Sequence, residues 1–215
     1  SGKIDSDKVD AGDGDDFVSL HAYGYEYYSY GYKYNTSTIT SVEVKAGEGD
    51  NTVIANRYYY SNTYQSPIEG FKVTVGDGND LISLSSRNVN IEAGDGKNTV
   101  VSDGANISIE AGKGNDYISA TGDNETINAD GGNNTIYSSG SYASLTTKDG
   151  KDYIYSTGSN ATISTGDDTV ADTIYSAGSN VMISAGAGDN YVSSAGDNIK
   201  LNVGDGNDRS EERRV

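Results

Sequence analysis

The sequence repeats a short glycine- and aspartate-rich segment whose residue types suit the binding of a hard cation. Residues 75–80 read Val-Gly-Asp-Gly-Asn-Asp, and similar segments lie at 11–16 and 111–116. Glycines at alternate positions permit positive φ angles, so backbone carbonyls can turn inward at a tight corner. Calcium takes about six to eight oxygen ligands, largely carbonyls and carboxylates. Stacked corners of this composition would offer both kinds of oxygen from two successive turns of the chain.

These corners recur at a fixed spacing. Starting from Gly76, the segment returns every 18 residues at positions 94, 112, 130 and 148, and after a two-residue slip at 186 and 204. Within each unit the seventh position is Ile or Val, the sixteenth is Ile or Leu, and the eighteenth is Ala, Thr or Val. Such aligned columns indicate a repeat architecture in which each unit packs on its neighbours.

The elements between the corners read as short strands. Each unit holds two segments with a period of two residues, such as 117–120 and 125–128, each followed by a Gly- or Asn-rich corner. We therefore predict an all-β fold: a right-handed parallel β-roll or β-solenoid of about ten 18-residue coils. It would form one domain over residues 1–208, with insertions within about 21–44 and 56–72, and with a charged tail or cap at 209–215.

Residues 76–83, Gly-Asp-Gly-Asn-Asp-Leu-Ile-Ser, resemble the RTX (repeats-in-toxin) nonapeptide G-G-x-G-x-D-x-U-x, with Val75 in place of the first glycine. In that family the Asp carboxylate and neighbouring corner carbonyls hold calcium between adjacent coils of a parallel β-roll. The resemblance covers residues 12–208 apart from the insertions. It implies calcium as the cofactor and nominates as side-chain ligands Asp16, Asp80, Asp116, Asp152, Asp172 and Asp208. Supporting carboxylates would come from Asp77, Asp95, Asp149, Asp167 and Asp205.

The chain also departs from the RTX pattern. An RTX roll carries the calcium nonapeptide on both edges, but here the opposite corner is Gly-x-Asn and predicts a metal-free asparagine ladder. The ladder residues are Asn106, Asn124, Asn160, Asn180 and Asn198. On the calcium-like edge, Asp is replaced in turn by Asn51, Asn98, Asn134 and Asn190, and Lys97, Lys113 and Lys151 occupy the same corners. A hydrogen-bonded Asp/Asn ladder without metal therefore remains the alternative at this edge.

Tyrosine is concentrated in the two insertions. We expect these residues to form a lid over the first coils or a contact surface for a glycan or a second copy of the protein. The contact residues are Tyr23, Tyr25, Tyr27, Tyr30, Tyr32, Tyr34, Tyr58, Tyr59, Tyr60 and Tyr64. A second tyrosine stripe, on outward strand positions, is either ordinary cross-strand stacking or a binding strip. Its members are Tyr117, Tyr137, Tyr153, Tyr155, Tyr175 and Tyr191.

Composition narrows the function further. A net charge of −17 argues against nucleic acid and anionic membranes as partners, and no apolar run is long enough to insert into a bilayer. The chain has no Cys and a single His, His21, which gives little support for catalysis. We expect a secreted or cell-surface structural module that folds on calcium outside the cell, such as a segment of an adhesin, surface-layer or fibre protein. The alternative is a carbohydrate-binding or export module that accompanies an exoenzyme. The solenoid ends could also mediate self-association.

Overall fold

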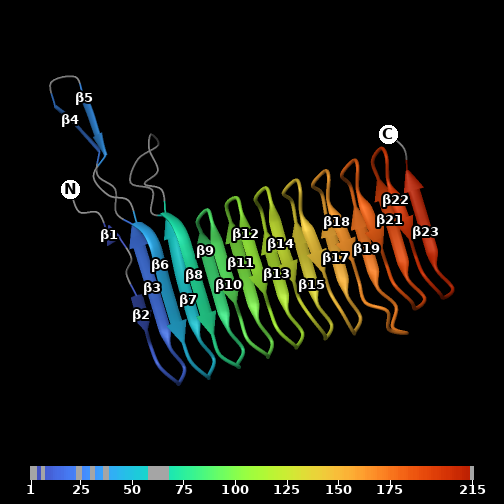
Figure 1. The fold of residues 1–215 in the computed structure, drawn as a ribbon, viewed down its shortest axis with the longest axis horizontal. Coiled ribbons are helices and arrows are strands. Elements are labelled where there is room, and N and C mark those ends of the chain that lie inside the picture. Colours follow the sequence, from blue (N-terminus) through green and yellow to red (C-terminus); the bar gives the residue numbers. More distant parts are fainter. Residues whose placement is uncertain are drawn as a thin grey trace.

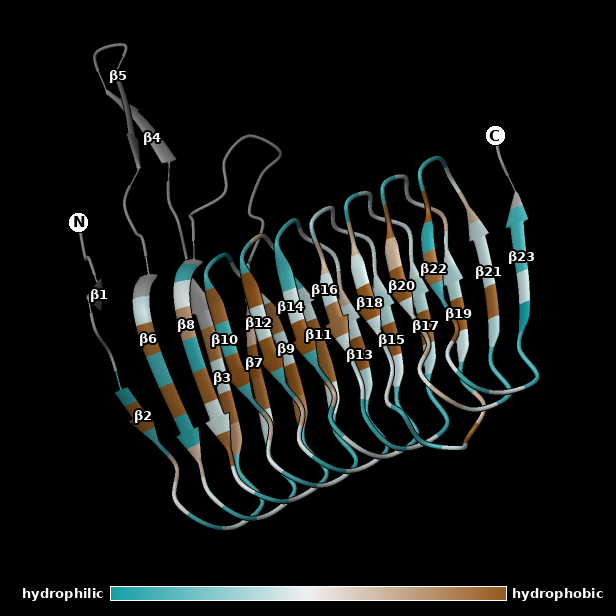
Figure 2. Ribbon diagram, turned by 45° about the vertical axis from the view of Figure 1, so that its right-hand side comes forward, coloured by the Kyte–Doolittle hydropathy of each residue, from teal (hydrophilic) through white to brown (hydrophobic). Residues whose placement is uncertain are grey.

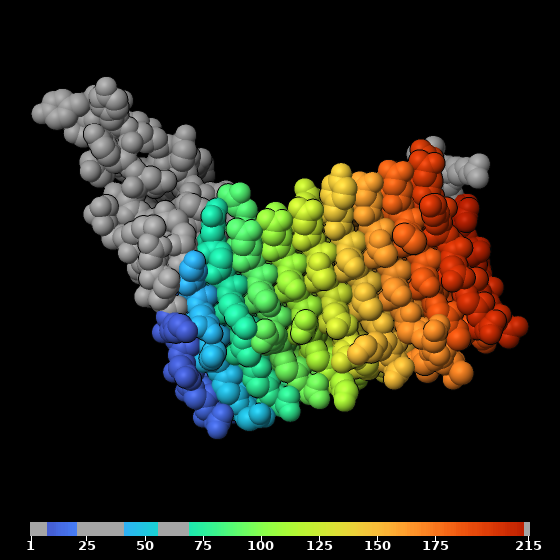
Figure 3. Space-filling model, viewed as in Figure 1, coloured from blue at the N-terminus to red at the C-terminus, as the bar shows by residue number. Residues whose placement is uncertain are grey.

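In the computed structural model, residues 4–5, 8–22, 26–29, 32–35, 39–57 and 68–213 are described. They form two long parallel β-sheets that face each other, joined by corners at both edges (Figure 1). The chain passes from one sheet to the other at each corner, so successive coils advance along a rod. Figure 3 shows these coils as side-by-side bands from the N-terminal to the C-terminal end.

Sheet A has eleven strands. They are β1 (Ile4–Asp5), β2 (Lys8–Asp10), β6 (Ile39–Ala46), β8 (Ile68–Val75), β10 (Val89–Glu92), β12 (Ile107–Glu110), β14 (Glu125–Asn128), β16 (Ser144–Thr146), β18 (Thr162–Ser164), β20 (Met182–Ser184) and β22 (Lys200–Asn202).

Sheet B has ten strands. They are β3 (Phe17–Ala22), β7 (Thr52–Arg57), β9 (Leu81–Ser85), β11 (Thr99–Asp103), β13 (Tyr117–Ala120), β15 (Thr135–Ser138), β17 (Tyr153–Ser156), β19 (Thr173–Ser176), β21 (Tyr191–Ala195) and β23 (Arg209–Arg213). Within the first insertion, β4 (Glu26–Ser29) and β5 (Tyr32–Asn35) form a separate antiparallel pair.

The strands of each sheet stack in register, which places chemically similar residues above one another. Ile118 of β13 pairs with Val100 on one side and Ile136 on the other, and Ile127 of β14 pairs with Ile109 and Leu145. These residues point between the sheets and are fully buried. Figure 2 shows the resulting bands of hydrophobic residues crossing the strands. Burial of these columns against the neighbouring coils drives folding, because no single coil encloses a core.

The corners stack so closely that some positions accept only glycine. A Cβ atom added to Gly122 would lie 1.5 Å from the carbonyl oxygen of Gly104 in the preceding coil. No side chain fits that distance without moving the backbone. Glycine at such a position therefore allows the two coils to approach to strand-pairing distance.

The predicted fold class is confirmed, and the expected strands at 117–120 and 125–128 coincide with β13 and β14. The first insertion connects β3 to β6, and the second connects β7 to β8. Residues 209–213, assigned from the sequence to a tail or cap, form β23 and extend sheet B by pairing with β21. Among the described residues, no helix has the length and hydrophobicity needed to cross a membrane.

Candidate metal centre

A column of Asp and Asn residues runs along the edge of the rod where each sheet A strand turns into the next sheet B strand. We call it the Asp/Asn column: Asp16, Asn51, Asp80, Asn98, Asp116, Asn134, Asp152, Asp172, Asn190 and Asp208. All of its members are buried except Asp16 and Asp208 at the two ends, which are half-buried. The structure thus brings all six nominated aspartates into one column, interleaved with the asparagines.

From Asn51 to Asp208, one side-chain oxygen of each column residue accepts a backbone N–H of the preceding coil. The backbone N–H of Asn98 donates to Oδ1 of Asp116 at 2.8 Å, and the N–H of Asp80 donates to Oδ1 of Asn98 at 3.0 Å. The same bond recurs along the column for both residue types. Asp and Asn are equivalent in this respect, because each supplies one accepting oxygen.

The second side-chain atom distinguishes the two residue types. In Asn51, Nδ2 donates to the carbonyl oxygens of Gly47 and Gly49, both at 2.9 Å. The Nδ2 atoms of Asn98, Asn134 and Asn190 likewise donate to two or more carbonyl oxygens at the corner. The corner carbonyls therefore converge on the position of the amide nitrogen.

In the aspartates the corresponding atom is an oxygen, which cannot donate. Oδ2 of Asp16, Asp80, Asp116 and Asp152 is buried and has no hydrogen-bond partner. The corners of Asn98 and Asp116 are alike: Gly94 and Gly96 before Asn98 have φ angles of 69° and 139°, and Gly112 and Gly114 before Asp116 have 76° and 139°. A buried carboxylate oxygen without a donor is costly unless a proton or a cation reaches it.

The pKa values of the four buried column aspartates are raised, as expected for buried carboxylates. Burial raises the pKa of Asp116 and of Asp152 to about 7, and neighbouring carboxylates contribute in the same direction. Burial also raises the pKa of Asp80 and Asp172 above the ordinary value. Asp152 and Asp172 are the pair of aspartates that follow each other in the column without an intervening Asn, and Asp172 Oδ1 accepts the N–H of Asp152 at 2.9 Å. Negative charge is therefore most concentrated at this pair.

The nominated supporting carboxylates are all exposed rather than buried in the column: Asp77, Asp95, Asp149, Asp167 and Asp205. Asp77 and Asp95 are exposed on the outer side of the corners, and their Oδ1 atoms accept the N–H groups of Asp95 and Lys113 in the following coil. Lys97, Lys113 and Lys151 are also exposed. In the described part of the chain, no three His, Cys, Asp or Glu side chains gather to hold a metal among themselves. A cation at this edge would consequently take much of its coordination from carbonyl oxygens.

The opposite corner carries the predicted asparagine ladder. Asn106 Nδ2 donates to Asn88 Oδ1 at 2.8 Å, and the bond repeats from Asn124, Asn180 and Asn198 to the Asn one coil earlier. The ladder asparagines adopt φ angles near 60°, which Asn tolerates well. Tyr142 occupies the equivalent position with a φ of 62° and interrupts the ladder. The sequence interpretation missed it because it followed the Asn residues alone.

A buried acid lies beside this second corner and was not anticipated. Glu125 begins β14 in a column otherwise filled by apolar residues, including Ile107 and Ala143 in the adjacent coils. Its carboxylate accepts the N–H of Gly122 at 2.8 Å and the hydroxyl of Ser138. Burial raises the pKa of Glu125 above its ordinary value. The sequence contained one indication of this buried acid, namely a single Glu at a repeat position that is apolar in the other units.

The tyrosines of the insertions cannot be placed in the same way. Tyr23, Tyr25, Tyr30, Tyr58, Tyr59, Tyr60 and Tyr64 lie outside the described residues. Tyr27 belongs to β4, and Tyr32 and Tyr34 belong to β5. Only the strands are described at these positions, and the side chains are not. The contact surface proposed for the insertions stays a prediction.

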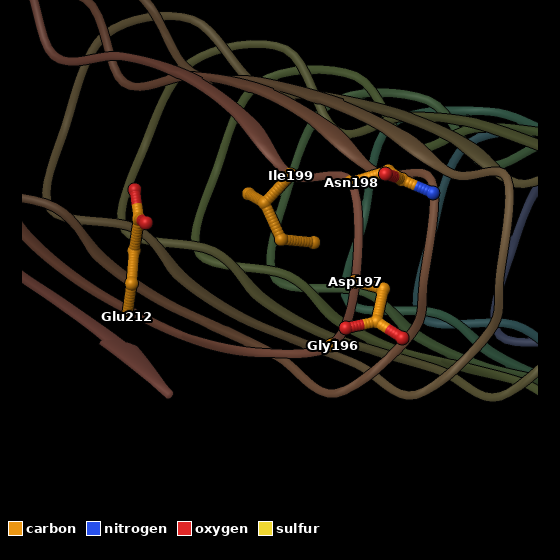
Figure 4. Close-up of a pocket in the computed structure, with 5 residues that line it drawn as sticks. All are labelled: Gly196, Asp197, Asn198, Ile199 and Glu212. Atoms are coloured by element: carbon orange, nitrogen blue, oxygen red, sulfur yellow. The ribbon is translucent and has the colours of Figure 1, made fainter. Parts of the chain in front are cut away.

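A cavity of about 400 Å³ opens at the C-terminal end of the rod, away from the Asp/Asn column. It is lined by Gly196, Asp197, Asn198, Ile199 and Glu212 (Figure 4). Ile199 points into the space between the two walls of the coil. The cavity is the uncovered interior of the last coil, where a further coil would pack, so we assign it no chemistry of its own.

A family model described as RTX calcium-binding nonapeptide repeat (4 copies) matches residues 1–21, 74–106, 108–136 and 164–198, which is more than half of the chain. Together with the stacked parallel coils, this match defines the class of protein: a calcium-binding β-roll. The chain belongs to the RTX calcium-binding repeat family. Comparisons with curated proteins and with solved structures gave no match.

The residues at the Asp/Asn column fit calcium. The orphaned Oδ2 atoms of four column aspartates supply carboxylate oxygens, and the Asp116 corner shares the backbone angles of the Asn98 corner, whose carbonyls converge on the amide nitrogen. When bound, calcium would neutralise the buried carboxylates and link two coils. Asp16, Asp80, Asp116, Asp152, Asp172 and Asp208 would hold it together with the corner carbonyls. The asparagine corners need no ion, because their amide protons already satisfy those carbonyls.

Proposed function

We propose that this chain is an extracellular structural module, such as a segment of an adhesin, surface-layer or fibre protein, that folds when it meets calcium outside the cell. The observation that carries the proposal is the unpartnered, buried Oδ2 at Asp16, Asp80, Asp116 and Asp152. Without calcium these carboxylates oppose coil stacking at neutral pH, since burying an unpaired charge is unfavourable. With calcium the same atoms join adjacent coils.

The expected calcium affinity supports an extracellular location for the module. Extracellular calcium modules bind in the range of about 0.1–1 mM, far above the calcium level of a cytosol. A chain with this affinity would be weakly structured during synthesis and would fold after export. RTX repeats occur typically in secreted proteins, which supports the same proposal.

We propose further that this chain has no catalytic role. Its single His and lack of Cys leave few groups for nucleophilic or acid–base chemistry at neutral pH, and the repeat itself accounts for the many carboxylates. Any reaction would then belong to another part of a longer parent protein.

Far-UV circular dichroism tests the folding proposal directly. The chain is stripped of calcium with EGTA and titrated with calcium, with magnesium as the control ion. We expect a transition from coil to β structure in the range of about 0.1–1 mM calcium and a much weaker response to magnesium, which demands a tighter octahedral site. A full β spectrum in EGTA that calcium leaves unchanged would show that the ladders and core suffice, and the proposal would fail.

A further inference from the structure

A continuous strip of tyrosine rings lies on the outer face of sheet B. It contains Tyr117, Tyr137, Tyr153, Tyr155, Tyr175 and Tyr191, from the five consecutive strands β13 to β21. Ring centroids of successive members lie 5.6–6.0 Å apart, from Tyr117 through Tyr137 and Tyr153 to Tyr175 and Tyr191. The ring planes are inclined by 48–60°, so three pairs are tilted against each other and Tyr175 meets Tyr191 edge to face.

The rings remain accessible. Tyr117, Tyr137 and Tyr155 are 42%, 37% and 40% exposed, and the other three are half-buried beside them. Leu81 and Val101 extend the apolar surface on the N-terminal side and are 39% and 37% exposed. Five of the exposed large hydrophobic side chains of the described chain thus share one face.

The two tyrosine columns carry no charge between residues 81 and 193, and the acid nearest to them on this face is Asp103 at the end of β11. From residue 81 to residue 193, the two outward columns that hold the tyrosines contain only Leu, Val, Thr, Ser and Tyr. The chain as a whole has a net charge of −17, so a neutral, hydroxyl-rich strip is a distinct surface on it. The nearest cation in these columns is Arg209 of β23, whose guanidinium lies 5.6 Å from the ring centroid of Tyr191.

The absence of cations and the narrow shape limit the partner. Single-stranded nucleic acids also stack on aromatic rows, but they need a basic groove along the phosphates, and these two columns have none before Arg209. The strip spans about 20 Å by 7 Å, from strand spacing of about 4.8 Å and residue spacing of about 3.4 Å. Its accessible surface is a few hundred Å², since three of its rings are about 40% exposed at roughly 200 Å² each, and this is below the ~800 Å² that each partner buries in a stable protein–protein interface.

We propose that the tyrosine strip binds a neutral, linear polysaccharide chain. A sugar ring has an apolar C–H face and a rim of hydroxyls, which matches a tyrosine ring with its own hydroxyl and with Ser and Thr hydroxyls alongside. A linear polysaccharide repeats along one direction, as the tyrosine strip does. Because such a chain is narrow, it can lie along the strip without contacting residues on either side. The inference goes beyond the calcium-dependent folding proposed above and concerns a different face of the rod.

Native affinity electrophoresis in saturating calcium tests this inference. The gels contain hydroxyethyl cellulose, a soluble β-1,3-glucan, or xylan as neutral polymers, and hyaluronan, which calcium does not gel, as an acidic one. The test variant is Tyr137→Ser/Tyr155→Ser/Tyr175→Ser, because the same column holds Ser at 119 and 193 and the sheet accepts it there. The control is Tyr142→Asn, which removes an exposed tyrosine from the opposite corner, outside the strip.

We expect at least one neutral polymer to retard the protein, hyaluronan to have little effect, and the triple variant to bind about tenfold more weakly or not at all. The control should bind as the unmodified chain does. Circular dichroism of each variant separates loss of binding from loss of folding, and Tyr155→Ser alone should weaken binding in a folded protein. The inference is overturned if no neutral polymer retards the protein, if a folded triple variant binds equally well, or if the strip instead mediates self-association.

Discussion

At the scale of single residues, the exchange of one side-chain atom decides whether a corner is complete. Asn98 and Asp116 occupy the same place in nearly identical backbones, and both accept one N–H from the preceding coil. The amide of Asn98 then donates to corner carbonyls, whereas Oδ2 of Asp116 has no partner. The asparagine corner closes by itself, and the aspartate corner needs an additional positive group.

Replacing Asp116 by Asn should therefore lower the calcium requirement for folding. Satisfying the corner carbonyls and removing a buried carboxylate should stabilise the calcium-free fold by about 1–3 kcal/mol. A circular dichroism titration should show half-folding at a several-fold lower calcium concentration. The reverse change, Asn98→Asp, places three carboxylates in succession and should raise the midpoint. Equal midpoints for Asp116→Asn and the unmodified chain would contradict this account of the corner.

The buried Glu125 gives a pH prediction. Its folded-state pKa is raised above the ordinary 4.5, so the folded protein holds the proton to a higher pH than the unfolded chain does. The stability that this provides is present below the unfolded pKa and is lost as the pH rises through the raised value. In saturating calcium, Glu125→Gln should melt close to the unmodified chain at about pH 4 and higher by a few degrees at about pH 8. Titration of the aspartates affects both proteins and cancels, so a pH-independent difference would refute the role of Glu125.

At the scale of elements, each corner of the coil is held by its own ladder. The second corner uses asparagine amides at left-handed φ angles, and Tyr142 is the member that can neither donate nor accept in their place. A bulky residue in this backbone region is unfavourable, and Asn160 lacks an amide oxygen in the coil before it. The ladder is thus divided at this point in the middle of the rod.

Tyr142→Asn should restore the ladder and stabilise the fold. Relief of the backbone strain and two exposed amide bonds should contribute about 1 kcal/mol together, which corresponds to a rise of about 2–4 °C in melting temperature. Differential scanning calorimetry in calcium would measure it. Tyr142→Ser is the matched control, since it removes the ring without supplying an amide. If Tyr142→Asn melted no higher than this control, the ladder would have no measurable energetic role.

The strands and their register follow from the sequence because one in-register column, such as Ile118 with Ile136, suffices to align whole coils. The Asp/Asn column was predictable for the same reason. Side-chain directions at the corners were not predictable: Asp77 is exposed, and its Oδ1 accepts an N–H of the following coil, so its support of the metal stays a prediction. The buried position of Glu125 and the left-handed φ angle of Tyr142 were not predicted either. Each residue differs in type from the others in its column, and only the stacked neighbours show which type it replaces.

At the scale of the whole molecule, stability is a sum over interfaces between neighbouring coils. The sheets run unbroken from β3 to β23 and from β6 to β22, so a weak interface in the middle affects the coils on both sides. Aspartates occupy every second coil of the column up to Asp152 and then two in succession with Asp172. Calcium would accordingly act at intervals along the rod, and the asparagine coils would connect the loaded ones.

Converting all six column aspartates to asparagine should make the rod independent of calcium. The variant combines Asp16→Asn, Asp80→Asn, Asp116→Asn, Asp152→Asn, Asp172→Asn and Asp208→Asn. Each corner would then resemble that of Asn98, with amide protons in place of the cation. We expect a β spectrum in EGTA and a melting temperature that calcium does not change. The measurement is thermal circular dichroism with EGTA and with calcium for the variant and the unmodified chain.

A matched control separates this effect from the loss of six negative charges. Asp13, Asp50, Asp103, Asp123, Asp189 and Asp197 are exposed and lie outside the column, and their conversion to Asn changes the net charge equally. That control should still need calcium, because its buried carboxylates are unchanged. If both variants folded in EGTA, general charge repulsion would explain calcium dependence. If the column variant still needed calcium, the ion would be held at other residues, and the Asp/Asn column would be a ladder without metal.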